Sequence, residues 1–272
     1  PNENEQNRLF DMMCQEYEKY GTSMIIAVLL GAAFLFWFFR KEQSVQTLFT
    51  EKKKMSNMAF FQILCVFMGG QLVFGLGGNV LEIGFNLIGY TAAESLETAS
   101  ASSETLSMFL YACLMAPVIE ELVYRGFVLR SLQRYGKWFA IVVSSVLFGV
   151  MHANLPQGIF AFYVALILAY VAMEYSIIWS MVLHMVNNCL FGDVLGYLLK
   201  PLPEKTQEGI WMAILIAFFI AGIVIIIRHH REVVAYFKKV QSGKCRYLFL
   251  SVCTVIYFVL TIGATCLSIT KL

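Results

Sequence analysis

A few ionisable and amide side chains stand inside otherwise apolar segments of this chain. They are Glu120, Glu121, Arg125, His152, His184, Asn188 and Asp193. A carboxylate, imidazole rings and an amide can together activate a water molecule and stabilise the anion formed when water attacks a carbonyl group. The same residue types can also bind a metal ion or hold helices together. Their spacing helps to separate these possibilities.

The two adjacent glutamates differ in their relation to Arg125. Glu121 and Arg125 are four residues apart, so on a helix they share one face and can neutralise each other. Glu120 is rotated by about 100° from Glu121 and is less well placed to join that pair. We therefore interpret Glu121 as structural and Glu120 as available for chemistry, with an ion-paired packing cluster as the alternative. Pro117, almost one turn earlier, cannot donate a backbone hydrogen bond and predicts a kink beside Glu120.

The histidines are also spaced by one helical turn from a second motif residue. Phe148 precedes His152 by four residues, and His184 precedes Asn188 by four. With a helix rise of about 1.5 Å per residue, Glu120, His184 and Asn188 reach a similar depth near the middle of a membrane. His152 fits this layer least well. We expect Glu120 to pair with His152 on the next helix.

Composition predicts an all-α, polytopic membrane helix bundle. The 272 residues are 59% hydrophobic and 14% charged, and about 20 apolar residues suffice for a helix to cross a bilayer. Eight segments are expected to cross it, at 22–39, 58–76, 105–129, 138–151, 158–175, 177–199, 210–227 and 247–269. We expect residues 1–272 to form one integral membrane domain with a catalytic core at 105–200. Residues 79–90, after the second segment, are a candidate interfacial helix.

The distribution of basic residues predicts the orientation. With eight crossings, 14 of the 20 Lys and Arg residues fall on one side of the membrane. Both termini fall on the other side, which is outside by the positive-inside rule. The polar segment 1–21 has no basic region of the kind that begins a signal peptide. We expect membrane lipid as a partner and no nucleic acid. His229 and His230 lie in a basic loop and are interpreted as surface residues.

Three complete motifs in this order resemble the CPBP family of CAAX-prenyl endopeptidases (type II) and bacteriocin-processing, immunity-type or abortive-infection-like membrane proteins. They are E-E-x-x-x-R (Glu120, Glu121, Arg125), F-x-x-x-H (Phe148, His152) and H-x-x-x-N (His184, Asn188). The stretch FGVMHANLPQG resembles the bacterial branch, which implies a multi-pass protein of the bacterial cytoplasmic membrane. Each motif alone is weak, and the three together are specific.

The resemblance implies an intramembrane endopeptidase with a glutamate mechanism. Glu120 and His152 would hold and deprotonate the attacking water, and His184 with Asn188 would stabilise the oxyanion. Glu121, Arg125 and Phe148 would support them. The substrate would be a membrane-associated peptide or protein, such as a bacteriocin leader, a pheromone precursor or a lipidated peptide. We expect it to enter from the lipid or from the basic face.

Three alternatives remain open. Glu120, His152 and His184 could ligate zinc, although the H-E-x-x-H helix of metalloproteases is absent and a metal-free mechanism without cofactor is favoured. The protein could instead be a non-catalytic immunity or regulatory partner of the same family. Transporters also bury ionisable residues, but the chain shows no duplicated halves. The seven scattered cysteines contain no C-x-x-C pair and are interpreted as small core residues.

Overall fold

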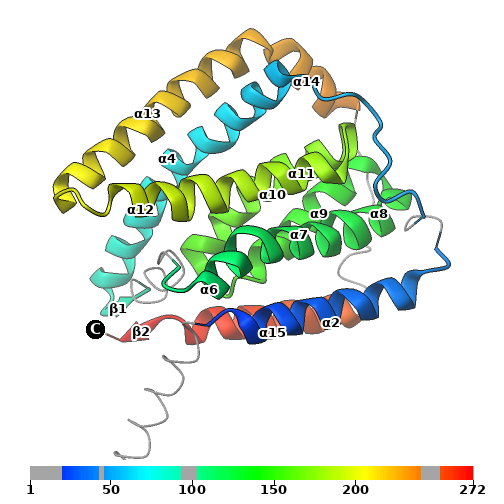
Figure 1. Ribbon diagram of the computed structural model, residues 1–272, viewed down its shortest axis with the longest axis horizontal. Helices are drawn as coiled ribbons and strands as arrows, with labels where there is room; N and C mark the ends of the chain where they lie inside the picture. The colour runs from blue at the N-terminus through cyan, green and yellow to red at the C-terminus, as the bar shows by residue number, and fades with distance from the viewer. Residues whose placement is uncertain (1–19, 43–45, 93–102, 240–251, 272) are drawn as a thin grey trace, which may run out of the picture.

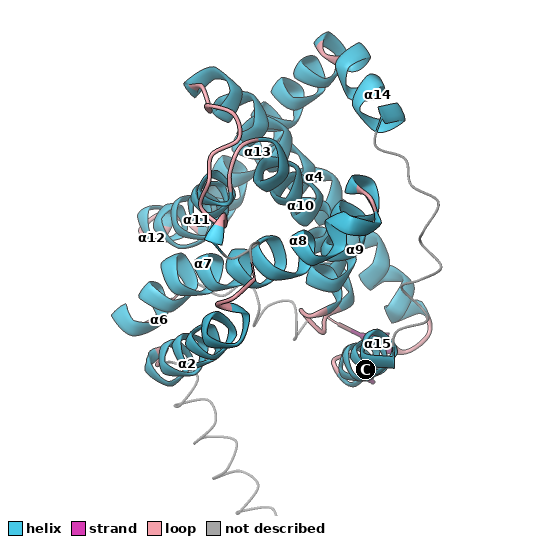
Figure 2. Ribbon diagram, turned by 90° about the vertical axis from the view of Figure 1, so that its right-hand side faces the viewer, coloured by secondary structure: helices cyan, strands magenta, loops and turns pink. Residues whose placement is uncertain are grey.

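The chain folds as a bundle of long helices with almost no other regular structure (Figure 1). The computed structural model describes residues 20–42, 46–92, 103–239 and 252–271. Its uninterrupted helices are α2 (Thr22–Phe39), α4 (Asn57–Leu87), α9 (Lys137–Val150), α10 (Leu155–Glu174), α13 (Glu204–Arg228), α14 (His230–Lys239) and α15 (Val252–Leu267). Figure 2 shows that α2 and α15 lie at the edge of the bundle away from α4 and α13.

Two further helical segments are composites that switch between α- and π-helical turns. The first comprises α6 (Leu106–Leu110), the π-helical η1 (Tyr111–Met115), α7 (Ala116–Glu121), the π-helical η2 (Leu122–Val128), α8 (Leu129–Leu132) and a final 3₁₀ turn, η3 (Gln133–Tyr135). The second comprises α11 (Ile177–Met185), η4 (Val186–Val194) and α12 (Leu195–Leu199). These two composites carry the first and third sequence motifs, and π-helical turns often mark functional sites.

The helices confirm an all-α, multi-pass integral membrane protein. Within the part of the chain that the structure describes, six helices are long and apolar enough to cross a membrane, and α9 and α15 are shorter apolar helices. Each of the eight predicted segments overlaps one of these helices, and residues 247–251 of the last predicted segment lie outside the described residues. Large apolar side chains such as Leu30, Phe34 and Ile220 are exposed on the outside of the bundle, where hydrocarbon rather than water surrounds a membrane helix.

The predicted end of the second helix was wrong. It was expected at residue 76, followed by a separate interfacial helix, but α4 continues without a break to Leu87. Beyond it, β1 (Tyr90–Thr91) pairs antiparallel with β2 (Thr270–Lys271) and links the end of α4 to the C-terminal end of the chain. The helix passes through several glycines in this stretch, and Gly75, Gly77 and Gly84 have open space where a side chain would lie.

Figure 1 shows, toward its right, the end of the bundle where α8 leads into α9 and α13 leads into α14. We call it the basic end, because the connections there carry Lys52, Arg130, Lys137 and Arg228. The connection between α2 and α4 is fastened there: Arg130 Nη2 donates to the carbonyl of Leu48 at 2.7 Å. Lys52 Nζ donates to the carbonyl of Met173 at 3.1 Å, and burial lowers the pKa of the Lys52 ammonium group. These contacts fix the loops that join the helices at the basic end.

Helices α9 and α10 approach each other most closely at a pair of glycines near His152. A Cβ atom added to Gly149 would lie 2.7 Å from the carbonyl oxygen of Gly158, and one added to Gly158 would lie 2.9 Å from that of Gly149. Both contacts are to backbone, which cannot move aside as a flexible side chain can. The second motif is therefore held against α10 by the absence of side chains at these two positions.

We expect Gly149→Ala to separate α9 from α10 and to lower the free energy of unfolding by about 1–3 kcal/mol, the usual cost of overpacking. Gly31→Ala is the matched control, because nothing lies within 4 Å of a Cβ at Gly31 in α2. Unfolding of the purified protein in detergent by denaturant would measure both. Equal stability of the two variants would contradict the packing described here.

Candidate active site

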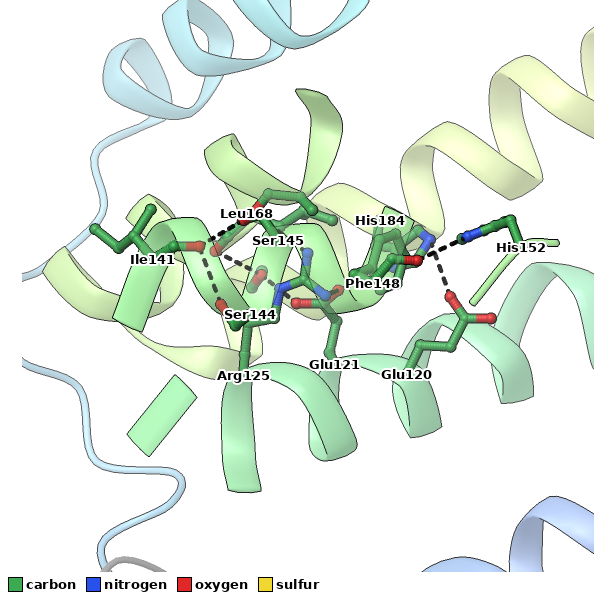
Figure 3. Close-up of polar contacts among 12 residues, drawn as sticks. Glu120, Glu121, Arg125, Ile141, Ser144, Ser145, Phe148, His152, Leu168 and His184 are labelled. Carbon is green, nitrogen blue, oxygen red and sulfur yellow. Dashed lines mark hydrogen bonds and ion pairs between the residues drawn. The ribbon is translucent and has the colours of Figure 1, made fainter. Parts of the chain in front are cut away.

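The centre of the site is a fully buried carboxylate, Glu121, which receives donors from two helices (Figure 3). Arg125 Nη1 lies 3.3 Å from Glu121 Oε1, one turn along the same helix. His184 Nδ1 lies 3.1 Å from that same oxygen, and Ser180 Oγ donates to Glu121 Oε2 at 2.5 Å. The geometry confirms the predicted Glu121–Arg125 pair and shows that Glu121 also holds the ring of His184. Because the carboxylate is surrounded in this way, Glu121 is closed to a substrate.

Arg125, which pairs with Glu121, also contacts the neighbouring helices α9 and α10. Its guanidinium carbon lies 4.4 Å from the centre of the Phe148 ring on α9, and Nη2 donates to the carbonyl of Ala165 on α10 at 3.3 Å. The Phe148 ring meets His152 and His184 edge to face, with centroid distances of 5.0 and 5.9 Å. Phe148 is thus the apolar spacer between the arginine and both histidines.

Glu120 faces a different environment from its neighbour. Its side chain is 25% exposed, whereas that of Glu121 is fully buried. Glu120 Oε2 lies 3.8 Å from Nε2 of His184, so the two nitrogens of one imidazole face the two adjacent glutamates. The ion-pair partner of Glu120 in this structure is therefore His184, and not His152 as we expected. Figure 3 shows Glu120 turned toward His184 while Glu121 is turned toward Arg125.

His152 lies just beyond the end of α9, in the turn that leads to α10. Its Nδ1 is 2.9 Å from the carbonyl oxygen of Phe148, and a carbonyl can only accept, so Nδ1 carries the hydrogen and Nε2 carries a lone pair when the ring is neutral. Ala153 has a φ of 51°, and the Asn154 side chain caps α10 by accepting from Gln157 N. The position of His152 is thus set by this turn and by the carbonyl of Phe148 at the end of α9.

Asn188 is fixed by a chain of amide hydrogen bonds that crosses three helical segments. Asn188 Nδ2 donates to the carbonyl of Ala112 at 3.2 Å, and Asn187 Nδ2 donates to Asn188 Oδ1 at 2.9 Å. Gln71 Nε2 on α4 donates to Asn187 Oδ1 at 2.6 Å. Sequence reasoning missed Gln71, Asn187 and the serine bound to Glu121. Two of them, Asn187 and Gln71, are polar residues inside apolar segments, and that signal could have found them.

The π-helical turns account for the placement of the first and third motifs. Before α7, the Ala116 N–H bonds the Tyr111 carbonyl, five residues back rather than four, in the turn directly before Pro117, which has no amide hydrogen to donate. Glu120 and Glu121 lie in the α-helical turns between two π-helical stretches, and Asn188 lies within the third. Such turns rotate the side chains beyond them, which regular helical spacing did not anticipate.

Glu120, His152, His184 and Asn188 all line one cavity of about 740 Å³. Its other lining residues are Gln71, Tyr111, Ala112, Ala116, Phe148, Gln157, Phe160, Ala161, Val164, Asn187, Phe191, Gly192, Asp193, Gly196, Leu199, Gln207, Glu208 and Trp211. The helices that carry the three motifs do not enclose the cavity alone, because α4, α10 and α13 also contribute walls. A cavity of this volume lies within the range that is typical of binding sites.

The described part of the chain contains no group of three or more His, Cys, Asp and Glu side chains placed to hold a metal ion. Glu120 and His184 approach each other, but the Nδ1 atoms of both histidines are engaged with protein oxygens. The alternative zinc set of Glu120, His152 and His184 is thus not preformed as a ligand cluster. A metal-free mechanism remains a prediction.

Fold and site together define a membrane helix bundle with a polar chamber that contains a carboxylate, two imidazoles and an amide. Residues 102–190 match the family model described as Rce1-like, type II CAAX prenyl endopeptidase. This segment, which contains all three motifs, is therefore similar to a Rce1-like domain of the CPBP family, which is a family of proteases. The comparisons with curated proteins and with solved structures gave no match.

We expect Arg125→Met to be strongly destabilising, because it leaves the Glu121 carboxylate buried without its cation. Breaking one partner of a buried pair typically costs about 3–5 kcal/mol. The double variant Glu121→Gln/Arg125→Met removes both charges and should recover part of that loss. Denaturant unfolding in detergent measures all three, with exposed Arg134→Met as the control. Additive effects of the two substitutions would show that the charges do not depend on each other.

Proposed function

We propose that this protein is an intramembrane endopeptidase that hydrolyses a peptide bond of a membrane-associated peptide or protein. The observation that carries the proposal is the contrast between the two glutamates: Glu121 is sealed among its donors, while Glu120 opens into the cavity beside two histidines and an asparagine. The family of the Rce1-like domain supports proteolysis. The membrane location of the site favours a substrate that is itself held in or at the membrane.

In the proposed mechanism a water molecule attacks the carbonyl carbon of the bound peptide. Glu120 takes the proton of this water, and the lone pair on His152 Nε2 accepts its second hydrogen bond, which orients the oxygen for attack. The proton on Glu120 then passes to the nitrogen of the leaving amine. This sequence needs no other proton donor, since the water proton is returned to the product.

The negative charge on the former carbonyl oxygen needs donors that are already in position. His184 is held at Nδ1 by Glu121, so its Nε2–H, when present, is directed into the cavity beside Glu120. The Asn188 amide has a second N–H besides the one bonded to Ala112. Donors fixed in advance stabilise the tetrahedral intermediate without reorganising during the reaction.

The nucleophile is proposed to be water rather than a side chain. Among the described residues that line the cavity there is no Ser, Thr or Cys. Ser180 lies close to Glu121 but is buried, and its hydroxyl contacts both the Glu121 carboxylate and the carbonyl of Leu168. An acyl-enzyme route, which requires an accessible nucleophile beside its base, therefore has no support in the described chamber.

We expect Glu120→Gln to abolish cleavage, with a loss of at least about 10³-fold in kcat, because removing a general base also removes the acceptor of the water proton. Glu204→Gln, on an exposed residue of α13 outside the cavity, should leave cleavage unchanged. Mass spectrometry of peptides in membranes of cells expressing each variant identifies the substrate and measures its cleavage together. Chelators should not alter the wild-type activity.

The alternative of a non-catalytic immunity or regulatory partner gives the opposite result. If Glu120→Gln accumulates normally and the cellular phenotype persists without any difference in peptides, the endopeptidase proposal fails. If chelation abolishes activity and the purified protein contains stoichiometric zinc, the protein is still a hydrolase but the metal-free mechanism is wrong.

A further inference from the structure

The cavity occupies only one half of the bundle along the helix axes. On α9 and α10 the lining residues cluster around the turn at His152, from Phe148 to Val164. On α13 they lie in the first two turns, from Gln207 to Trp211, and on the composite containing α11 they begin at His184. On the composite containing α7 they end at Glu120, in its first half. Every one of these portions points away from the basic end.

The cavity is closed on the side that faces the basic end. Below, the catalytic layer means the level of the bundle at which Glu120, His152, His184 and Asn188 lie. Glu121, Arg125, Leu129 and Leu168 lie between that layer and the basic end, and each is at most 1% exposed. In the other direction exposure increases, from 7% for the side chain of His184 to 25% for that of Glu120, and Glu208 at the rim is exposed. The route from the surface to Glu120 therefore runs from the end opposite the basic loops, which is the left end in Figure 1.

The rim of this route has a distinct charge. Asp193 and Glu208 are carboxylates, and Gln157 and Gln207 are amides. Among the described residues that line the cavity there is no Lys or Arg. Asp193 is held in place, because Oδ1 accepts from Ser103 N at 2.6 Å and Oδ2 accepts from Ser103 Oγ at 3.1 Å. A peptide carrying a carboxylate at this rim would meet the like charge of these two carboxylates that line the cavity.

We propose that the chamber opens on the extracytoplasmic face of the membrane and takes an extended peptide segment from that face, with neutral or basic residues at the rim. The orientation follows from the positive-inside rule, which places the basic end in the cytoplasm. The proposal rests on the proposed function for what happens at Glu120, but the access route stands on the cavity alone. It differs from our expectation of entry from lipid or from the basic face.

Two single-cysteine additions test the sidedness directly in intact cells expressing the full chain. Gln207→Cys places a thiol on the rim, and Arg134→Cys places one on an exposed residue of the basic end. The tryptic peptides that contain positions 207 and 134 include no native cysteine, so mass spectrometry reads each site separately. A membrane-impermeant methanethiosulfonate should label position 207 in intact cells and position 134 only after permeabilisation. Failure to label position 207 before permeabilisation would overturn the proposal.

The charge of the rim is tested at the same thiol with two impermeant reagents, a trimethylammonium and a sulfonate methanethiosulfonate. After correction for their rates with free cysteine, the cationic reagent should modify position 207 at least about threefold faster, because the carboxylates raise the local cation concentration. Adding Glu208→Gln should lower this ratio, and adding Glu204→Gln, outside the cavity, should not. A ratio of one, or equal effects of the two substitutions, would contradict a charge-selective rim.

These outcomes are separate from those of the proposed function, because neither labelling experiment requires catalysis. If position 207 is labelled from outside and Glu120→Gln changes neither the cellular phenotype nor the peptides, the endopeptidase proposal fails while the proposed access route stands. If cleavage depends on Glu120 but position 207 is labelled only from the cytoplasm, the endopeptidase proposal stands and the proposed access route fails.

Discussion

The interaction on which the rest of the structure depends is the burial of the Glu121 carboxylate. An ionised carboxylate without compensation is very costly within a membrane protein, so its position requires Arg125, His184 and Ser180 to converge on it. Those residues come from the helical segments Leu106–Tyr135 and Ile177–Leu199. One charge therefore fastens the two composite helices together, and the same contacts fix the imidazole that faces the neighbouring glutamate. The same contacts of Glu121 therefore both hold the helices together and position the His184 ring in the site.

Adjacent residues on a helix point in directions about 100° apart, and the chamber uses that difference. Glu121 is directed into the packed interface with Arg125, while Glu120 is directed into the cavity. The π-helical turns before and after α7 adjust these directions, and the small glycines at 149 and 158 bring His152 close to the same layer. A carboxylate that is partly open but surrounded by low-dielectric protein is well suited to accept a proton from water.

Much of this arrangement could be predicted from the sequence, because the determining signals are local. The length of the apolar segments predicts the membrane helices, and the four-residue spacing of Glu121 and Arg125 predicts their ion pair. The contact between Glu120 and His184 could not be predicted, since it depends on how two helices are rotated against each other by π-helical turns. The extent of α4 was also missed, because glycine weakens helices in water but is tolerated in membrane helices. The chain of amide hydrogen bonds from Gln71 through Asn187 to Asn188 depends on tertiary contacts that no single segment encodes.

The measurement that tests the central claim most directly is chemical modification of the two carboxylates in the folded protein. A carbodiimide with an amine nucleophile, followed by mass spectrometry of the peptide that contains both residues, reports the accessibility of each one. The account predicts amide formation at Glu120, loss of cleavage in step with it, and an unmodified Glu121. Equal modification of both glutamates, or modification of Glu121 alone, would contradict the division of roles between them.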